Sequence, residues 1–242
     1  MTALKFNQEY SFKASILIPM YNEAETILFL LNKVKKALTQ LDYEIIIVDD
    51  GSTDSSKEEV EKFMSINSKL NIQYIYQENM GKGGAIRTAI EHASGEILVV
   101  QDADMEYDPN DIPPLIDEFK NEVKVVYGSR NMIKEGREHS SVFFYWGGLL
   151  VTHATNFLFG SKLTDEATGY KLFHAEVFNR FSFKHNDFAW EPEITAKILK
   201  NKIDIIEKPI SYKPRSKSEG KKISWTDGVK AIWVLLCEYF RR

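Results

Sequence analysis

Acidic side chains gather in three short stretches of this 242-residue chain. The stretches are 19–23 (PMYNE), 49–54 (DDGSTD) and 101–106 (QDADME), and each follows an apolar run typical of a buried strand. Ligands of α/β sheets bind beyond the carboxyl ends of the strands. One acidic run is often a solvated turn that caps a helix. Three at one edge would repel each other without a cation or hydrogen-bond donors to share, so the pattern indicates a ligand site.

The third stretch predicts a metal site. Asp102 and Asp104 are separated by one residue, so both carboxylates can face one hard cation, and Glu106 can complete the set. Carboxylates together with phosphate oxygens are the ligands that Mg²⁺ and Mn²⁺ prefer. We therefore expect Asp102, Asp104 and Glu106 to hold one of these ions, which would neutralise a diphosphate and help it leave.

A glycine-rich turn could bind phosphate. Gly81, Gly83 and Gly84 surround Lys82 just before a predicted helix, where backbone N–H groups and the positive helix end attract anions. The spacing matches neither the P-loop nor the dinucleotide-binding pattern. The alternative is that these glycines serve a tight turn and close packing, and the sequence leaves both interpretations open.

Strands and helices alternate in the first half of the chain. Apolar, β-branched runs predict strands at 15–19, 43–48, 72–76, 96–100 and 123–127. Amphipathic spacing predicts helices at 24–41, 54–64, 82–93 and 111–121. This alternation is typical of βαβ units, so we expect an α/β fold with a mostly parallel central sheet and flanking helices.

The second half is less regular. The aromatic-rich segment 141–160 predicts one or two helices, and further helices are expected at 193–200 and 225–239. Strands are expected at 170–173 and 203–206, and a polar, basic loop at 214–224. Glu191 and Glu193 are expected to serve the start of their helix, where the dipole favours acids. No repeat or linker divides the chain, which predicts a single domain.

Composition narrows the class of protein. Hydrophobic residues make up 43% and charged residues 27%, as in soluble globular proteins. The single cysteine, Cys237, excludes an intramolecular disulfide and any multi-cysteine metal site. The net charge of −4 argues against a general nucleic-acid binder. No signal-peptide pattern and no membrane-spanning apolar run is present, so we expect a cytoplasmic protein.

Positive charge is concentrated near the C-terminus. Residues 211–242 carry eight Lys or Arg and three Asp or Glu, a net +5 against −9 for the rest, which suggests an anionic partner. The segment 228–242 presents a wide apolar surface that ends in two arginines, and it includes Trp233 and Tyr239, which suit a membrane interface. The alternative is that this helix packs on the core or on a second subunit. We expect peripheral binding to an anionic membrane.

Together these stretches resemble family 2 glycosyltransferases of the GT-A fold, most of all the dolichol-phosphate mannosyltransferases and their bacterial polyprenyl-phosphate relatives. The resembling motifs are IPMYNEAE (18–25), IIVDDGSTD (46–54), GKGGAIRTA (81–89), QDADMEYDP (101–109), GSR (128–130), DEATGYKLF (165–173) and the basic loop. They cover residues 14 to about 228. The resemblance implies one GT-A domain over residues 1–242, with a nucleotide-sugar half at 14–130 and an acceptor half at 131–242 that holds the basic loop and the C-terminal helix.

The resemblance also implies roles for individual residues. It places Asp104 as the main metal ligand, with Glu106 where the family commonly has Gln. Asp165 is the acidic residue beside the acceptor, and Lys171 stands where dolichol enzymes often have an arginine that could bind an acceptor phosphate. Asp104, Arg130 and Asp165 are the expected catalytic residues. The expected nucleotide-sugar-binding residues are Pro19, Tyr21, Glu23, Asp49, Asp50, Lys82, Asp102, Ala103, Asp104, Arg130, Arg215 and Lys221.

The implied reaction is a metal-dependent, inverting transfer of a hexose from GDP-mannose or a UDP-sugar to a polyprenyl or dolichyl phosphate. A phosphate with a second pKa of about 6 is largely ionised near neutral pH and needs little help from a base. A sugar hydroxyl would need a base, for which Asp165 is the candidate. The alternatives are transfer to a glycan hydroxyl in surface polysaccharide assembly, and a nucleotide-sugar-binding protein without turnover.

Overall fold

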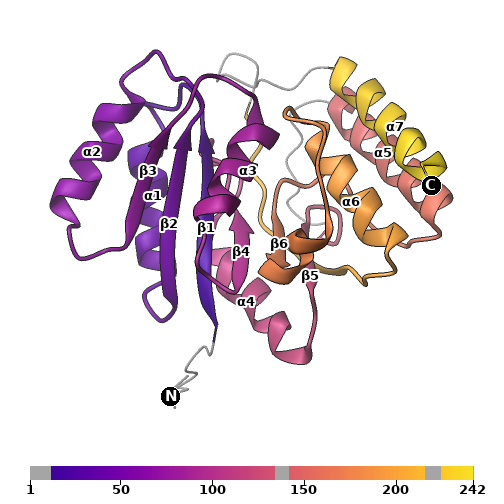
Figure 1. The fold of residues 1–242 in the computed structure, drawn as a ribbon, viewed down its shortest axis with the longest axis horizontal. Helices are drawn as coiled ribbons and strands as arrows, with labels where there is room; N and C mark the ends of the chain where they lie inside the picture. The colour runs from indigo at the N-terminus through magenta and orange to yellow at the C-terminus, as the bar shows by residue number, and fades with distance from the viewer. Residues whose placement is uncertain (1–11, 134–141, 216–224, 242) are drawn as a thin grey trace.

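Seven strands form one sheet in the order β3-β2-β1-β4-β6-β5-β7 (Figure 1). The structure is a computed structural model that describes residues 12–133, 142–215 and 225–241. The strands are β1 (Lys13–Met20), β2 (Asp42–Asp49), β3 (Ile72–Tyr76), β4 (Ile97–Val100), β5 (Val125–Ser129), β6 (Lys171–His174) and β7 (Ile206–Pro209). All seven were expected from the sequence, although the last begins three residues later than predicted.

The sheet is mostly parallel, as expected. β1 pairs in parallel with β2 and β4, β2 pairs in parallel with β3, and β5 pairs in parallel with β7. β6 is antiparallel to both of its neighbours, β4 and β5. Because this strand comes from the second half of the chain and lies between two strands of the first half, both halves contribute to one sheet.

Among the residues that the structure describes, seven α-helices flank the sheet or lie beyond it. They are α1 (Ile27–Ala37), α2 (Ser56–Ile66), α3 (Lys82–His92), α4 (Ile112–Asp117), α5 (Val142–Phe159), α6 (Trp190–Lys200) and α7 (Trp225–Phe240). Residues 142–159 of the predicted helical segment thus form one helix. The helix predicted at 24–41 is shorter, because residues 23–26 form a turn in which the Glu23 carbonyl accepts from the N–H groups of Thr26 and Ile27. The helix predicted at 111–121 is a short α-helix between two 3₁₀ turns.

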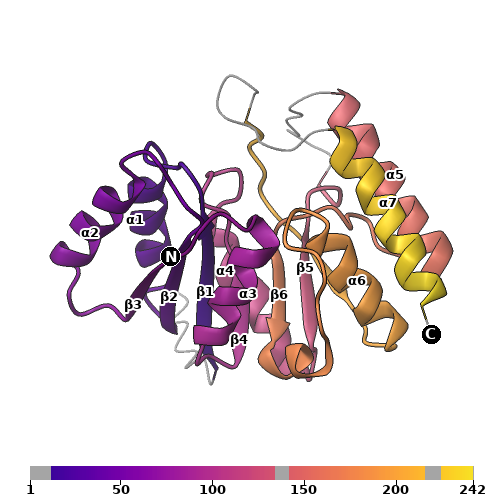
Figure 2. The same ribbon diagram turned by 45° about the horizontal axis from the view of Figure 1, so that its top comes forward.

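The helices form layers around the sheet. One face packs against α1, α2 and α4 through a core that includes Ile16, Ile47 and Leu30. The other face packs against α3 and α6, where Ile86 and Ile194 contribute to the core. α5 and α7 lie beside each other beyond α6, at one end of the molecule in both views (Figures 1 and 2). Within the part of the chain that the structure describes, no helix has the length and apolar character to cross a membrane.

The three acidic stretches begin at neighbouring positions on one sheet edge. Met20 of β1 pairs with Asp49 of β2, and Leu17 of β1 pairs with Val100 of β4. Each stretch then turns sharply through a left-handed residue: φ is 51° at Asn22, 82° at Gly51 and 63° at Met105. The parallel strands therefore bring the predicted site residues together, as the sequence pattern required.

Candidate active site

Asp104, just beyond β4, is a carboxyl group of this edge with a raised pKa. Its Oδ2 lies 3.3 Å from Nη2 of Arg215, and its Oδ1 accepts a hydrogen bond from the Glu106 N–H. Burial, reinforced by the neighbouring Asp102 and Glu106 carboxylates, raises the pKa of Asp104 to about 7. Carboxylates that lie close enough to raise each other's pKa are stabilised by a cation bound between them.

Arg215 supplies positive charge to that group. Its guanidinium binds both carboxylate oxygens of Glu23, at 3.0 and 3.1 Å, in the two-pronged geometry that suits an arginine–carboxylate pair. Its backbone N–H donates to Oε1 of Glu106 at 2.8 Å. Arg215 thus joins residues of the first and third acidic stretches, Glu23, Asp104 and Glu106, although it lies more than a hundred residues away in the chain.

The segment 211–215 lies along the third acidic stretch. Tyr212 forms an antiparallel bridge with Tyr107, and its hydroxyl donates to Oε2 of Glu106 at 2.8 Å. The Lys213 N–H donates to the Glu106 carbonyl at 2.9 Å. Glu106, a predicted metal ligand, therefore holds this segment in place. Lys221, the second cation expected on the basic loop, lies outside the described residues.

Lys82 is enclosed by two carboxylates. Its Nζ lies 2.8 Å from Oδ1 of Asp102 and 2.7 Å from Oε1 of Glu191, and all three side chains are largely buried. The ammonium group is therefore paired with two carboxylates of the protein, and its contact with a donor phosphate stays a prediction. Sequence reasoning assigned Glu191 only to the start of α6. No local signal reveals its pairing with a lysine 109 positions away.

Two backbone N–H groups of the glycine turn before α3 also have hydrogen-bond acceptors within the protein. The Gly81 N–H donates to Oδ2 of Asp50 at 2.7 Å, and the Gly84 N–H donates to the Asn186 carbonyl at 2.8 Å. A Cβ on Gly83 would lie 2.5 Å from Cβ of Trp190. These glycines permit close packing, so the second interpretation of the turn fits the structure, and phosphate binding at the turn stays a prediction.

The paired aspartates after β2 hold the adjoining turns. Asp49 accepts from the Ser52 N–H and the Tyr74 hydroxyl, at 2.8 and 2.6 Å. Asp50 accepts from Nε2 of Gln77 and the Met80 N–H, at 2.6 and 2.9 Å. Both aspartates are buried. Their carboxylates hold the loops at this edge of the sheet, and their role in binding a nucleotide sugar stays a prediction.

The remaining predicted pocket residues line the same edge. Tyr21 is exposed just beyond β1, Ala103 is buried between the two aspartates of the third stretch, and Pro19 lies within β1. Of these three, Tyr21 presents the most open surface. Their contact with a nucleotide also stays a prediction.

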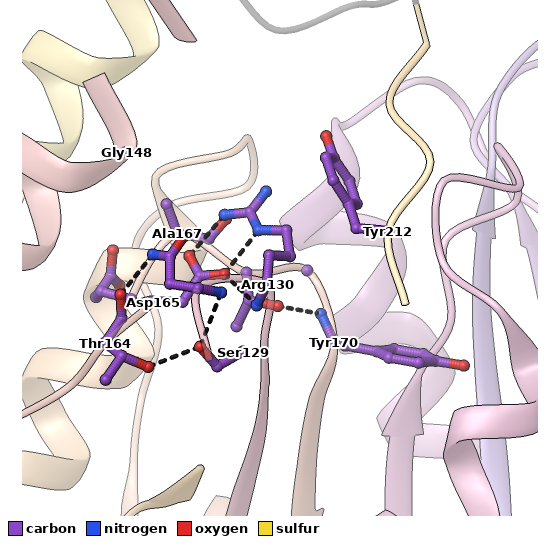
Figure 3. Close-up of polar contacts among 12 residues, drawn as sticks. Ser129, Arg130, Gly148, Thr164, Asp165, Ala167, Tyr170 and Tyr212 are labelled. Atoms are coloured by element: carbon purple, nitrogen blue, oxygen red, sulfur yellow. Dashed lines mark hydrogen bonds and ion pairs between the residues drawn. The ribbon is translucent and has the colours of Figure 1, made fainter. Parts of the chain in front are cut away.

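Arg130 and Asp165 form a second, tighter centre (Figure 3). Nε and Nη2 of Arg130 each lie 2.7 Å from a different oxygen of Asp165, and the Arg130 N–H donates to the same carboxylate at 2.9 Å. Arg130 also donates to the Ala167 carbonyl at 2.8 Å, and its guanidinium lies 5.1 Å from the centre of the Tyr212 ring. Asp165 is only 2% exposed, so its carboxylate serves Arg130 and is not free to act as a base.

Lys171 lies beneath this centre. It is fully buried, and its Nζ donates to the carbonyls of Glu166 and Thr168 at 2.7 and 2.6 Å. Burial lowers the pKa of Lys171. The residue therefore supports the 165–168 loop from the interior, and the expectation that it binds an acceptor phosphate is wrong.

The side chains at this edge fit a divalent cation, but with fewer protein ligands than the sequence predicts. Among the described residues, no three His, Cys, Asp or Glu side chains are grouped to enclose a metal. The expected triad is not assembled, because Asp102 pairs with Lys82 and Glu106 binds Tyr212 and Arg215. Mg²⁺ is usually held by one or two carboxylates together with substrate phosphates. Asp104, with its raised pKa, suits that arrangement, so the residues present fit the ion once a phosphate ligand is added.

The fold and the acidic edge of the sheet are those of a known family of enzymes. The family model "Glycosyl transferase family 2" matches residues 15–181, and the chain belongs to this family. The single α/β domain has the GT-A fold of its structural neighbours. The fold class and the family expected from the sequence are confirmed.

Similar curated proteins share a substrate class in their names. The chain is 30% identical over 213 residues to dolichol-phosphate mannosyltransferase of Pyrococcus furiosus, an alignment that covers 86% of this chain and 59% of the relative. It is 29% identical to dolichyl-phosphate beta-glucosyltransferase of Saccharomyces cerevisiae, covering 82% of this chain and 66% of that protein. The chain therefore spans about three fifths of the Pyrococcus relative's length.

Solved structures support the fold. Glucosyl-3-phosphoglycerate synthase of Mycobacterium tuberculosis, in complex with Mn²⁺, UDP and phosphoglyceric acid, superposes with a TM-score of 0.71 at 18% identity, covering 96% of this chain and 80% of that one. A mannosyltransferase of Pyrobaculum calidifontis, in complex with GDP-Man and Mn²⁺, gives a TM-score of 0.57 at 21% identity, covering 83% and 55%.

Proposed function

We propose that the protein transfers a hexose from a nucleotide diphosphate sugar to a polyprenyl phosphate, with inversion at the anomeric carbon and with Mg²⁺ or Mn²⁺ bound. The observation that carries the proposal is Asp104, a carboxyl group with a raised pKa that faces Arg215 at the ligand-binding edge of the sheet. The named relatives from Pyrococcus and Saccharomyces support the acceptor class.

The donor diphosphate would lie between Asp104 and Arg215. Asp104 would hold the divalent cation, with Asp102 behind it and Lys221 as a further cation from the basic loop. When bound, the cation supplies positive charge that stabilises the departing diphosphate. Arg215, whose planar fork matches phosphate oxygens, would contribute to the same stabilisation from the protein.

The resemblance places Arg130 beside the donor diphosphate, but we propose that the acceptor lies near Arg130. The pairing of Arg130 with Asp165 favours a phosphate acceptor over a hydroxyl. A hydroxyl needs a base, but both oxygens of the expected base, Asp165, are bound to Arg130. An ionised phosphate needs no base and can approach the partly exposed Arg130 guanidinium. We therefore assign Asp165 the role of orienting Arg130. Transfer to a glycan hydroxyl remains the second candidate.

A polyprenyl phosphate is reached at a bilayer surface, and the α5–α7 pair offers a face that suits one. Its large apolar side chains that stay more than half exposed are Trp146, Leu150, Phe157, Val229, Trp233 and Phe240. α5 also contacts the 165–168 loop that binds Arg130, because Oγ1 of Thr152 accepts a hydrogen bond from the Glu166 N–H at 3.0 Å. We propose peripheral binding through this face at the cytoplasmic side of a membrane.

Vesicle sedimentation tests the membrane contact. Trp146→Glu combined with Trp233→Glu should reduce recovery with anionic vesicles at low salt, since each change places a charge in the apolar face. Ile66→Glu is the matched control, because Ile66 is 75% exposed on α2, far from this face. Equal recovery of the double variant and the control would reject the assignment.

A transfer assay tests the function itself. The protein is incubated with labelled GDP-mannose or UDP-sugars, Mn²⁺ and either a polyprenyl phosphate in detergent or water-soluble glycans. We expect label in the lipid product only, and loss of that product in EDTA. Label in the glycans would favour the hydroxyl acceptor. Nucleotide-sugar binding without any transfer would favour the non-catalytic alternative.

A further inference from the structure

Arg215 places a positive charge beside the carboxylate of Asp104. Its Nη2 lies 3.3 Å from Oδ2 of Asp104 while the same guanidinium binds Glu23 through both of its outer nitrogens. Its backbone N–H is bound to Glu106. A divalent ion on that Asp104 oxygen would therefore meet a positive charge already in contact with it.

The contact with Asp104 is weak for an arginine–carboxylate pair. It is a single approach at 3.3 Å, longer than the usual 2.7–2.9 Å of such bonds. Nε of Arg215 is buried and makes no hydrogen bond. The guanidinium thus has donor capacity left over, which an additional anion such as a diphosphate could use.

We propose that Arg215 is an internal counter-ion of the donor site: it neutralises Asp104 until a divalent cation arrives, and it then turns to the diphosphate that arrives with that cation. The inference rests on the donor site of the proposed function. Two positive charges compete for Asp104 when the cation comes alone, whereas the nucleotide diphosphate gives Arg215 a new partner. Cation and nucleotide therefore bind cooperatively, and Arg215 is the residue that couples them.

Cation binding without nucleotide tests the first half of this proposal. Free Mn²⁺ is measured by its electron paramagnetic resonance signal during titration of the protein with neither donor nor acceptor present. Removal of a charge this close to Asp104 should tighten Mn²⁺ binding about tenfold in Arg215→Met. Arg215→Lys keeps the charge and should stay nearer to the parent affinity. Lys33→Met is the matched control, since Lys33 pairs with the nearby Asp108 and not with Asp104.

The same titration with a nucleotide diphosphate tests the coupling. The parent should bind Mn²⁺ much more tightly when GDP or UDP is present, and Arg215→Met should lose most of that gain. Asp104→Asn in the Arg215→Met background should abolish the tightened binding. Circular dichroism confirms that each variant is folded.

Equal Mn²⁺ affinities of the parent and Arg215→Met would overturn the proposal. Tight binding that survives Asp104→Asn would also overturn it, because the ion would then lie elsewhere. These outcomes are separate from the transfer reaction. If the protein transfers no sugar but Arg215→Met binds Mn²⁺ more tightly, the counter-ion role of Arg215 is supported and the proposed function is not. If the protein transfers sugar but the two Mn²⁺ affinities are equal, the counter-ion role is contradicted and the proposed function stands.

Discussion

Two arginine–aspartate pairs at the ligand edge differ in how completely they are satisfied. Arg130 binds both oxygens of Asp165 at 2.7 Å and adds a backbone N–H, and Asp165 is 2% exposed. Arg215 meets Asp104 once, at 3.3 Å, and the Asp104 side chain is 22% exposed. Tyr212 links the two centres, since its ring lies under Arg130 and its hydroxyl binds Glu106.

The difference shows how one pair of residue types can serve two purposes. A carboxylate whose oxygens are all bound within the protein fixes its arginine and cannot exchange partners at low cost. A carboxylate whose one contact with an arginine is long, and which has other carboxylates around it, is suited to exchange that contact for a ligand. We therefore assign the first pair to shaping the acceptor side and the second to binding the donor.

Asp104→Ala should have the largest effect on the reaction. Loss of the group that holds the cation should lower transfer by about a hundredfold or more, as removal of a key charge-stabilising group does elsewhere. The fold should persist, which circular dichroism would show. Full activity of this variant, or of the parent in EDTA, would contradict the assignment of Asp104 as the residue that holds the cation.

Arg130→Met should have the largest effect on stability. It leaves Asp165 buried without its partner, which should lower the free energy of unfolding by about 3 kcal/mol. Arg215→Met should cost less, about 2 kcal/mol: Asp104 is 22% exposed, although the change also removes the two bonds to the buried Glu23. Urea unfolding of both variants measures the contrast. An equal loss for the two would show that both pairs are structural.

The pH dependence of stability tests the raised pKa of Asp104 separately. The folded-state pKa is raised from 3.8 to about 7, so its contribution to stability is fully present below pH 3.8 and is lost as pH rises through about 7. Asp104→Asn cannot lose a proton there. Without metal, the parent should therefore lose stability relative to Asp104→Asn between pH 4 and pH 7. Parallel unfolding profiles of the two proteins would contradict the raised pKa.

The sequence predicts the first half of the molecule well because its signals are local. Each strand and helix there is marked by its own apolar spacing, and consecutive parallel strands necessarily bring their carboxyl ends to one edge. That is why the three acidic stretches could be expected to converge. The antiparallel direction of β6 depends on the path of long connections, which local patterns do not encode.

The roles of individual charged residues were predicted less well. Lys82 and Lys171 look in the sequence like cations available to phosphate, yet each is bound within the protein. Arg130 and Asp165 were both selected from the sequence, but their mutual pairing was not foreseen. A charged residue carries the same letter whether it faces a ligand or a buried partner, and only the folded chain brings distant partners together.

Manganese binding in the presence of a nucleotide diphosphate tests the central distinction most directly. The Mn²⁺ titration is repeated with GDP or UDP on the parent, Asp104→Asn and Asp165→Asn, each confirmed as folded. We predict that Asp104→Asn loses the bound Mn²⁺ and that Asp165→Asn retains it. Retention in Asp104→Asn, or loss in a folded Asp165→Asn, would contradict the assignment of the donor site to Asp104.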